Sequence, residues 1–163
     1  MDEARLNEIK EKLWEKIEFQ ILLEPKAQER ARDHLIKTKD GRVWNHKYKS
    51  KAQSLYEMQL GAFICQHRPD GPLKGPILLE IQAFFEVPVS RPKKFHAAAD
   101  RGEVWPEGKP DLDNVLKQFC DVATKVLFVD DAQIVDVRIS KHYGSPARWQ
   151  ITLWYRKDRQ GGN

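Results

Sequence analysis

Four aspartates and one lysine near the middle of the chain have the types and the spacing to bind a cation and act on a phosphate. Asp111 and Asp113 are two residues apart, Lys117 follows four residues later, and Asp130 and Asp131 come further on. Carboxylates without nearby His or Cys favour a hard cation such as Mg²⁺, which keeps several waters and binds phosphate. An ammonium group beside them could stabilise charge on a phosphoryl transition state. The pattern therefore predicts a metal-assisted phosphoryl-transfer site.

An extended entry and a helix must position the first of these residues. A proline favours an extended conformation before it, so Asp111 and Asp113 are expected to point to the same side of the chain. A helix is then expected from about 113 to 124, because its apolar residues recur with the 3.6-residue period. On its other side Asp113, Lys117 and Asp121 are i, i+4 neighbours and form a polar ridge.

A strand expected over 132–139 would carry Asp131 at its start. Asp131 has the same parity as the apolar side chains of that strand, so it is expected to point towards the helix, whereas Asp130 points away. The helix would be about 17 Å long, and segment 125–131 can span about 20 Å when extended. The carboxylates can therefore converge within one chain, and convergence across a dimer stays open.

A simpler interpretation of the same residues is structural. Asp at a helix start is a common N-cap, and the polar ridge could be a solvated row of ion pairs. That interpretation explains neither the second acid before the helix nor the adjacent pair Asp130 and Asp131. An EF-hand is excluded, because counting from Asp111 the sixth position is Leu116 and the twelfth is Val122, where that loop has Gly and Glu.

Several of these residues together match a known pattern. They are Lys-Pro-Asp-Leu-Asp-Asn at 109–114, Lys117, Asp121, Asp-Asp-Ala-Gln-Ile-Val-Asp at 130–136, and Lys141. The chain here resembles the RusA-type Holliday junction resolvases, and the resemblance covers roughly residues 16–156. It implies that Asp111, Asp113 and Asp131 bind the divalent metal and that Lys117 is needed for cleavage. Segment 26–32 departs from the family pattern, with Glu29 and Ala31 where the family favours Gly and Pro.

The expected function is that of a crossover junction endodeoxyribonuclease in DNA recombination and repair. The cofactor expected is Mg²⁺, with Mn²⁺ as a candidate substitute. Asp130 and Asp121 are candidates to contact and orient the metal ligands without binding the metal themselves. Two symmetric nicks resolve a four-way junction, and a C₂ homodimer with one carboxylate cluster per subunit supplies them; the resemblance implies the same.

Basic residues indicate a polyanionic partner. The net charge is +4 and the pI about 9.0, and residues 26–51 alone hold nine lysines and arginines against three acids. Trp44 and Tyr48 are interleaved with them, and Lys39-Asp-Gly-Arg42 predicts a hairpin turn. Such a basic hairpin suits a clamp on the phosphate backbone, although a solvated loop has the same composition. The candidate DNA contacts are Lys26, Arg30, Arg32, Lys93, Lys94, Lys109 and Lys141.

Length and composition favour one domain over 1–163, of class α+β, with a mixed sheet and two main helices. An extra N-terminal helix is expected at 2–16, a first strand at 17–23, and a second helix at 54–65 with Leu55 and Met58 among its core residues. An interior strand is expected at 76–87 and a mobile loop at 91–109. A last strand at 149–155 is expected to pair with the preceding strand as a hairpin.

The remaining features carry less information. Cys65 and Cys120 are 55 residues apart and are expected to be buried thiols in a reducing cytoplasm. No signal peptide and no membrane span is expected, which favours a cytoplasmic protein. The resemblance implies a bacterial or phage-encoded protein associated with the nucleoid. His96 is not needed as a metal ligand, because the oxygen ligands suffice. The alternatives left open are a non-catalytic module that binds branched DNA and a metal-dependent phosphatase or nuclease acting on small or linear substrates.

Overall fold

A four-stranded mixed sheet forms the centre of the molecule. The computed structural model describes residues 13–29 and 32–161. The strands are β1 (Trp14–Ile21), β4 (Ile77–Phe85), β5 (Ile134–Tyr143) and β6 (Arg148–Arg156), in the order β1-β6-β4-β5. β6 is antiparallel to both of its neighbours, whereas β4 and β5 are parallel. Together with its helices, this sheet confirms the α+β class.

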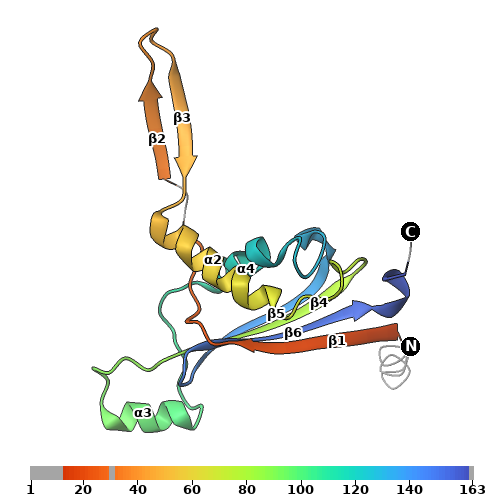
Figure 1. Ribbon diagram of the computed structural model, residues 1–163. Helices are drawn as coiled ribbons and strands as arrows, with labels where there is room; N and C mark the ends of the chain where they lie inside the picture. The colour runs from red at the N-terminus through yellow and green to blue at the C-terminus, as the bar shows by residue number, and fades with distance from the viewer. Residues whose placement is uncertain (1–12, 30–31, 162–163) are drawn as a thin grey trace.

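Two helices, α2 (Lys51–Cys65) and α4 (Leu112–Ala123), cover one face of the sheet (Figure 1). The strands turn alternate side chains towards them, as period-two alternation requires. Ile81 of β4 lies beside Ile151 of β6, and both are fully buried. Phe119 of α4 reaches this layer, where its ring centroid lies 6.1 Å from that of Trp149. The sheet and α4 therefore share one apolar core, which fixes the orientation of the polar side of α4.

The strand order corrects one expectation and confirms another. β4 is an interior strand, as predicted, because its alternate apolar residues are buried between β6 and β5. The predicted hairpin of the last two strands is wrong, since β6 pairs with β1 and β4. The turn after β5 instead crosses the end of β4, where the Gly144 amide donates a hydrogen bond to the Phe85 carbonyl at 2.9 Å. β4, which is more apolar than β5 and β6, thereby lies between these two strands in the interior of the sheet.

Two other segments differ from the sequence-based expectation. The helix predicted at 2–16 is wrong for its last three residues, because β1 already begins at Trp14, and the part at 2–12 lies outside the described residues. The segment 91–109 is not irregular throughout, because it contains helix α3 (Lys93–Asp100). Only Ala99 of α3 is buried, and so few core contacts leave little apolar periodicity in the sequence.

Helix α2 begins three residues earlier than predicted and buries a different face. Its buried residues are Gln53, Tyr56, Leu60 and Ile64. Leu55 and Met58, which were expected in the core, are exposed. The buried stripe includes the polar side chain of Gln53 and the hydroxyl-bearing Tyr56, so hydrophobicity alone misplaced it by about a third of a turn. Cys65 at the end of this helix is exposed, contrary to expectation, and Cys120 is buried as expected.

The basic hairpin is present as a separate two-stranded ribbon. It consists of β2 (Arg32–Lys37) and β3 (Val43–Tyr48) and extends away from the sheet and helices (Figure 1). The predicted turn is confirmed: the Thr38 amide donates to the Arg42 carbonyl at 2.9 Å, and Gly41 has a φ of 83°, which favours glycine. No helix in the described part of the chain is long and apolar enough to cross a membrane.

A short 3₁₀ turn replaces the expected start of the fifth strand. This turn, η1 (Asp131–Gln133), precedes β5, which begins only at Ile134. Asp131 therefore belongs to a turn and not to the strand. A second such turn, η2 (Lys157–Arg159), follows β6 near the end of the described chain. The position of Asp131 is consequently fixed by turn geometry and not by the alternation of a strand.

Candidate active site on helix α4

Helix α4 places the acidic residues at its start and along its solvent side. Asp111 occupies the N-cap position in an extended conformation, and its backbone carbonyl accepts a hydrogen bond from the Val115 amide at 3.1 Å. The side chain of Asp111 makes no capping hydrogen bond. Asp111 is exposed. Its carboxylate is therefore not used as a cap, which argues against the purely structural interpretation of this residue.

The polar ridge of α4 is exposed, as the helical period predicts. Asp113, Lys117 and Asp121 are all exposed, whereas Val115 and Phe119 are fully buried. The ion pairs among the described residues include none between Lys117 and either Asp113 or Asp121. The ridge is thus not a row of mutually neutralised charges. The Lys117 ammonium remains available to an anion brought to this face.

Two clefts border the polar face of α4, and Asn114 lines both of them. The first has a volume of about 430 Å³ and the second about 450 Å³. The first is lined by Glu24, Pro25, Lys26, Ala27, Phe85, Lys109, Pro110, Asp111 and Asn114. The second is lined by Gln28, Glu29, Asp33, Lys47, Lys49, Asn114, Lys117 and Asp121. The first cleft therefore joins Asp111 to two lysines, and the second joins Lys117 to the base of the ribbon.

The segment 24–29 contributes to both clefts and is fastened to both helices. The Tyr56 hydroxyl of α2 donates to the Glu24 carbonyl at 2.7 Å and accepts from the Lys26 amide at 3.2 Å. The Gln28 amide donates to the Asn114 carbonyl of α4 at 3.2 Å, and the Gln28 side chain donates to Asp121. Burial raises the pKa of Tyr56 to about 12, so its hydroxyl stays protonated and able to donate. The Lys26 backbone is thereby fixed at the cleft that Asp111 also lines, and the Lys26 ammonium lies 5.2 Å from the centroid of the Tyr56 ring.

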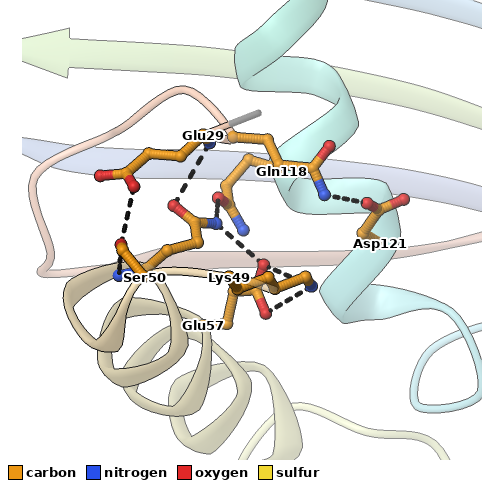
Figure 2. A network of polar contacts seen from close by, with 8 residues as sticks. Glu29, Lys49, Ser50, Glu57, Gln118 and Asp121 are labelled. Carbon is orange, nitrogen blue, oxygen red and sulfur yellow. Dashed lines mark hydrogen bonds and ion pairs between the residues drawn. The ribbon is translucent and has the colours of Figure 1, made fainter. Parts of the chain in front are cut away.

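A polar network ties the base of the ribbon to α2 and α4 (Figure 2). Ser50 caps α2 by accepting a hydrogen bond from the Gln53 amide, and its hydroxyl donates to Glu29 at 2.7 Å. The buried side chain of Gln53 donates to the Gln118 oxygen of α4 at 2.5 Å. Lys49 forms an ion pair with Glu57 at 2.8 Å. These contacts fix where the ribbon leaves the body relative to α4.

Lys141, predicted to contact DNA, is bound to the segment that leads into Asp111. Its ammonium donates to the Gly108 carbonyl at 2.7 Å and to the Pro110 carbonyl at 3.1 Å. Lys141 projects from β5, a strand of the rigid sheet, and is only half-exposed. The two carbonyls flank Lys109, and the Pro110 carbonyl belongs to the peptide joining Pro110 to Asp111. These two hydrogen bonds tie β5 to the segment that leads into Asp111.

Asp130 and Asp131 have different roles in the turn before β5. The Asp130 carboxylate accepts from the Ala132 amide at 2.9 Å, so it caps η1. Gln133 accepts from the Asp130 amide at 2.8 Å and donates to the Leu73 and Gly75 carbonyls. Asp131 is exposed. Burial raises the pKa of the Cys120 thiol to about 12, and the charges of Asp131 and Asp121 add to the shift.

The charge of Asp131 therefore acts on Cys120, near the end of α4, and not on the start of the helix, where Asp111 and Asp113 lie. Cys120 is seven residues after Asp113, which puts the two on nearly the same side of the helix and about 10 Å apart along its axis. Within residues 13–29 and 32–161, no group of three or more His, Cys, Asp or Glu side chains is arranged to hold a metal ion. The donor chemistry of the three aspartates suits Mg²⁺.

The other predicted DNA contacts are distributed over three regions. Lys26 and Lys109 line the first cleft, next to Asp111. Lys93 and Lys94 are exposed at the start of α3, which lies apart from α4 (Figure 1). Arg32 begins β2, whereas Arg30 lies outside the described residues. The predictions missed Asn114, although it lies inside the acidic motif, and also missed Lys47 and Lys49, which only the fold brings next to Lys117.

Comparison with known proteins identifies the family of this chain. A family model described as endodeoxyribonuclease RusA matches residues 23–154. The chain belongs to the RusA endodeoxyribonuclease family. The match includes α4, both clefts, the ribbon, β4, β5 and most of β6. A curated relative, the uncharacterized protein YqaN of Bacillus subtilis (strain 168), is 32% identical over 140 residues, which are 84% of this chain and 94% of that protein. Membership in the RusA family supports nuclease activity on DNA.

Proposed function

We propose that this RusA-family chain is a Mg²⁺-dependent endonuclease that resolves Holliday junctions by paired symmetric nicks. Membership in the family supports the reaction class. At the residue level, the proposal rests on the carboxylate of Asp111. This carboxylate does not cap α4, and Asp111 lines a cleft together with Lys26 and Lys109. An exposed acid between basic side chains suits a site where a cation and a phosphate meet.

The proposed ligands of the metal are Asp111, Asp113 and Asp131. When bound, Mg²⁺ would lower the pKa of a bound water and polarise the phosphodiester, and Mn²⁺ is a candidate substitute. Lys117 is exposed in the second cleft and would stabilise the negative charge on the phosphate at the transition state. Lys141 is proposed to hold the 108–110 segment so that Asp111 enters the cleft.

The remaining acids of the motif are proposed to act through their neighbours. Asp121 holds Gln28, and Asp130 holds η1, so each fixes a segment next to the proposed ligands. The cationic side chains of both clefts are proposed to hold the phosphate backbone. Affinity for DNA then falls steeply as the salt concentration rises, because each phosphate contact releases counterions.

A homodimer suits this function for two reasons. A four-way junction needs two nicks related by two-fold symmetry, which a C₂ dimer provides. Asp131 can then join Asp111 and Asp113 either from the same chain or across the subunit interface. The second arrangement agrees with the absence of a three-carboxylate group within the described part of one chain. A protein that acts on junction DNA would be located in the cytoplasm and associated with the nucleoid.

The decisive experiment measures nicking of a synthetic four-way junction with and without Mg²⁺. Asp113→Asn should reduce nicking to background while junction binding in Ca²⁺ stays within a few-fold of wild type. Asp70→Asn is the matched control, because Asp70 is an exposed aspartate in the loop after α2 that lines neither α4 cleft. Nicking by the Asp113→Asn protein at the wild-type rate would contradict the assignment of this residue.

A second candidate function is a branched-DNA-binding protein without catalysis. The observation that favours it is again that the described residues of one chain hold no ready three-carboxylate group. In that case the wild-type protein binds the junction tightly but does not nick it in Mg²⁺ or Mn²⁺ at any protein concentration that saturates binding. A dimer that nicks only when Mg²⁺ is added excludes this alternative.

A further inference from the structure

The ribbon formed by β2 and β3 exposes five large apolar side chains. Trp44 is 61% exposed and Ile36 is 43% exposed. The complete set of large apolar residues exposed on the ribbon is Leu35, Ile36, Val43, Trp44 and Tyr48. The ribbon stands clear of the sheet and helices (Figure 1), so these side chains do not serve the core. Large apolar side chains exposed away from the core mark a site of interaction.

The register separates the two faces of the ribbon. Ile36 lies opposite Trp44, whereas Lys37 lies opposite Val43. Because side chains of paired residues point to the same face and alternate along each strand, Trp44 and Ile36 form one apolar pair near the tip. Tyr48, four residues from Trp44 in β3, is on the same face near the base. The hydrogen-bonded turn holds the tip only two residues from Trp44.

The charge of the ribbon selects the partner. Residues 32–49 contain six lysines and arginines against two aspartates, a net charge of +4 that equals the net charge of the whole chain. Such a ribbon would repel a second copy of itself and attract a polyanion. A two-stranded ribbon has the width to approach a DNA groove, and an aromatic side chain among cations is the combination that stacks on bases while phosphates are held.

The distance from the tip to the clefts suits a branched DNA. Lys47 and Lys49, at the base of the ribbon, line the cleft that contains Lys117. Trp44 is five residues before Lys49, or about 17 Å along an extended strand. At about 3.4 Å per base pair this corresponds to about five base pairs of duplex. A phosphate held near Lys117 and a base stack met by Trp44 would therefore lie within half a helical turn of one another.

We propose that Trp44, supported by Ile36, stacks on the bases exposed at the exchange point of branched DNA. This inference rests on the proposed junction endonuclease and identifies how that enzyme would distinguish a junction from linear duplex. The interior of a linear duplex offers no free base face, whereas the strands at an exchange point can open one. The lysines of the ribbon contact phosphates in either DNA, so only the stacking contact is selective.

The test compares dissociation constants for a four-way junction and for a linear duplex of the same arm sequence, both in Ca²⁺. Trp44→Ala should weaken junction binding about 5- to 150-fold, the worth of one stacked base, and leave duplex binding within about two-fold. Val43→Ala is the matched control, since Val43 is exposed on the other face of the same strand. It should change neither constant. Trp44→Phe should retain most of the preference.

A spectroscopic readout tests the contact itself. With 2-aminopurine at the exchange point, wild-type protein should change the fluorescence of the probe, and Trp44→Ala should not. The same probe placed ten base pairs out in an arm should respond to neither protein. An equal loss of junction and duplex binding in Trp44→Ala, or a signal that persists without Trp44, would overturn the proposal.

Other outcomes separate this inference from the proposed function. Conversion of a dimer to a monomer by Trp44→Ala, measured by sedimentation, would make the ribbon an arm between subunits and overturn the stacking role. Normal selectivity in Trp44→Ala would refute only the inference, because the protein would still nick junctions. Failure of the wild-type protein to nick any DNA would refute the proposed function, whatever Trp44 does in binding.

Discussion

Lys141→Met tests which of two roles this lysine has. The sequence predicted that Lys141 contacts DNA, whereas its hydrogen bonds in the structure suggest that it positions the candidate metal site. The ammonium of Lys141 donates two hydrogen bonds, at 2.7 and 3.1 Å, to the carbonyls of Gly108 and Pro110. Hydrogen bonds made by a charged donor contribute about 1.5–3 kcal/mol each. Because Lys141 is half-exposed, we take about 2 kcal/mol for the pair. Methionine keeps the aliphatic stem and removes only these bonds and the charge.

The magnitude follows from how the segment 108–110 is held. If about 2 kcal/mol no longer favours the conformation that presents Asp111, the equilibrium constant for that conformation falls about 30-fold, and the population competent to bind metal falls by at most this factor. The Mg²⁺ concentration for half-maximal nicking should rise by a factor of up to about 30. The maximal rate should recover at saturating Mg²⁺, because no proposed ligand is lost. Junction affinity in EDTA should change by less than about three-fold.

The assays are nicking of a four-way junction across a Mg²⁺ series and calorimetric titration of the free protein with Mn²⁺. Lys16→Met is the matched control, because Lys16 is an exposed lysine of β1 bonded to Glu18 and lies outside both clefts. It should alter neither readout. An unchanged metal dependence in Lys141→Met, with weaker junction binding and a salt slope reduced by about one, would show that Lys141 contacts a phosphate and would refute the positioning role.

Three further predictions concern the contacts that hold the clefts together. Tyr56→Phe removes the two hydrogen bonds to Glu24 and Lys26 and should lower the free energy of unfolding by about 2 kcal/mol, which thermal denaturation would register as about 4–8 °C in Tm. Because the pKa of Tyr56 rises to about 12 on folding, the contribution of Tyr56 to stability is complete below about pH 10 and is lost as the pH rises towards 12. Denaturation at several pH values should therefore show that the free energy of unfolding falls less steeply above about pH 10 in Tyr56→Phe than in the wild type. Gln53→Leu leaves the buried Gln118 oxygen unpaired and should cost about 1–3 kcal/mol in urea denaturation, and combining it with Gln118→Leu should cost less than the sum of the single changes, whereas strict additivity would mean that the two side chains do not interact. Lys26→Ala should weaken junction and duplex binding to a similar degree and reduce the slope of log K against log salt by about one, and an unchanged slope would place Lys26 away from phosphate.

Some features of the site could be read from the sequence because they depend on local spacing. The i, i+4 ridge of Asp113 and Lys117 and the apolar side of α4 follow from the helical period, and both are present. The turn between β2 and β3 follows from the residues Lys39-Asp-Gly-Arg42, since glycine accepts the backbone angle required there. The α+β class follows in the same way from the sequence of strand and helix patterns.

Other features depend on contacts between distant residues, which local patterns do not encode. The buried face of α2 contains Gln53 because a partner for its amide, Gln118, is 65 residues away on α4. α3 could not be predicted, because it buries a single alanine. The position of β6 between β1 and β4 depends on pairing between strands that are far apart in the chain, which is a property of the assembled sheet.

The sequence by itself determined which residues can carry the chemistry: the aspartates, Lys117, the basic segment and the resemblance to RusA-type resolvases all rest on residue types and short spacings. Tertiary structure decided what each of these side chains is free to do. In the folded chain the Asp111 carboxylate does not cap α4, and Asp121 and Asp130 accept hydrogen bonds from neighbouring segments. The Lys141 ammonium donates to two carbonyls, and Trp44 is exposed on the ribbon. The physical reason is that hydrogen-bond partners and burial are settled only when segments far apart in the chain meet.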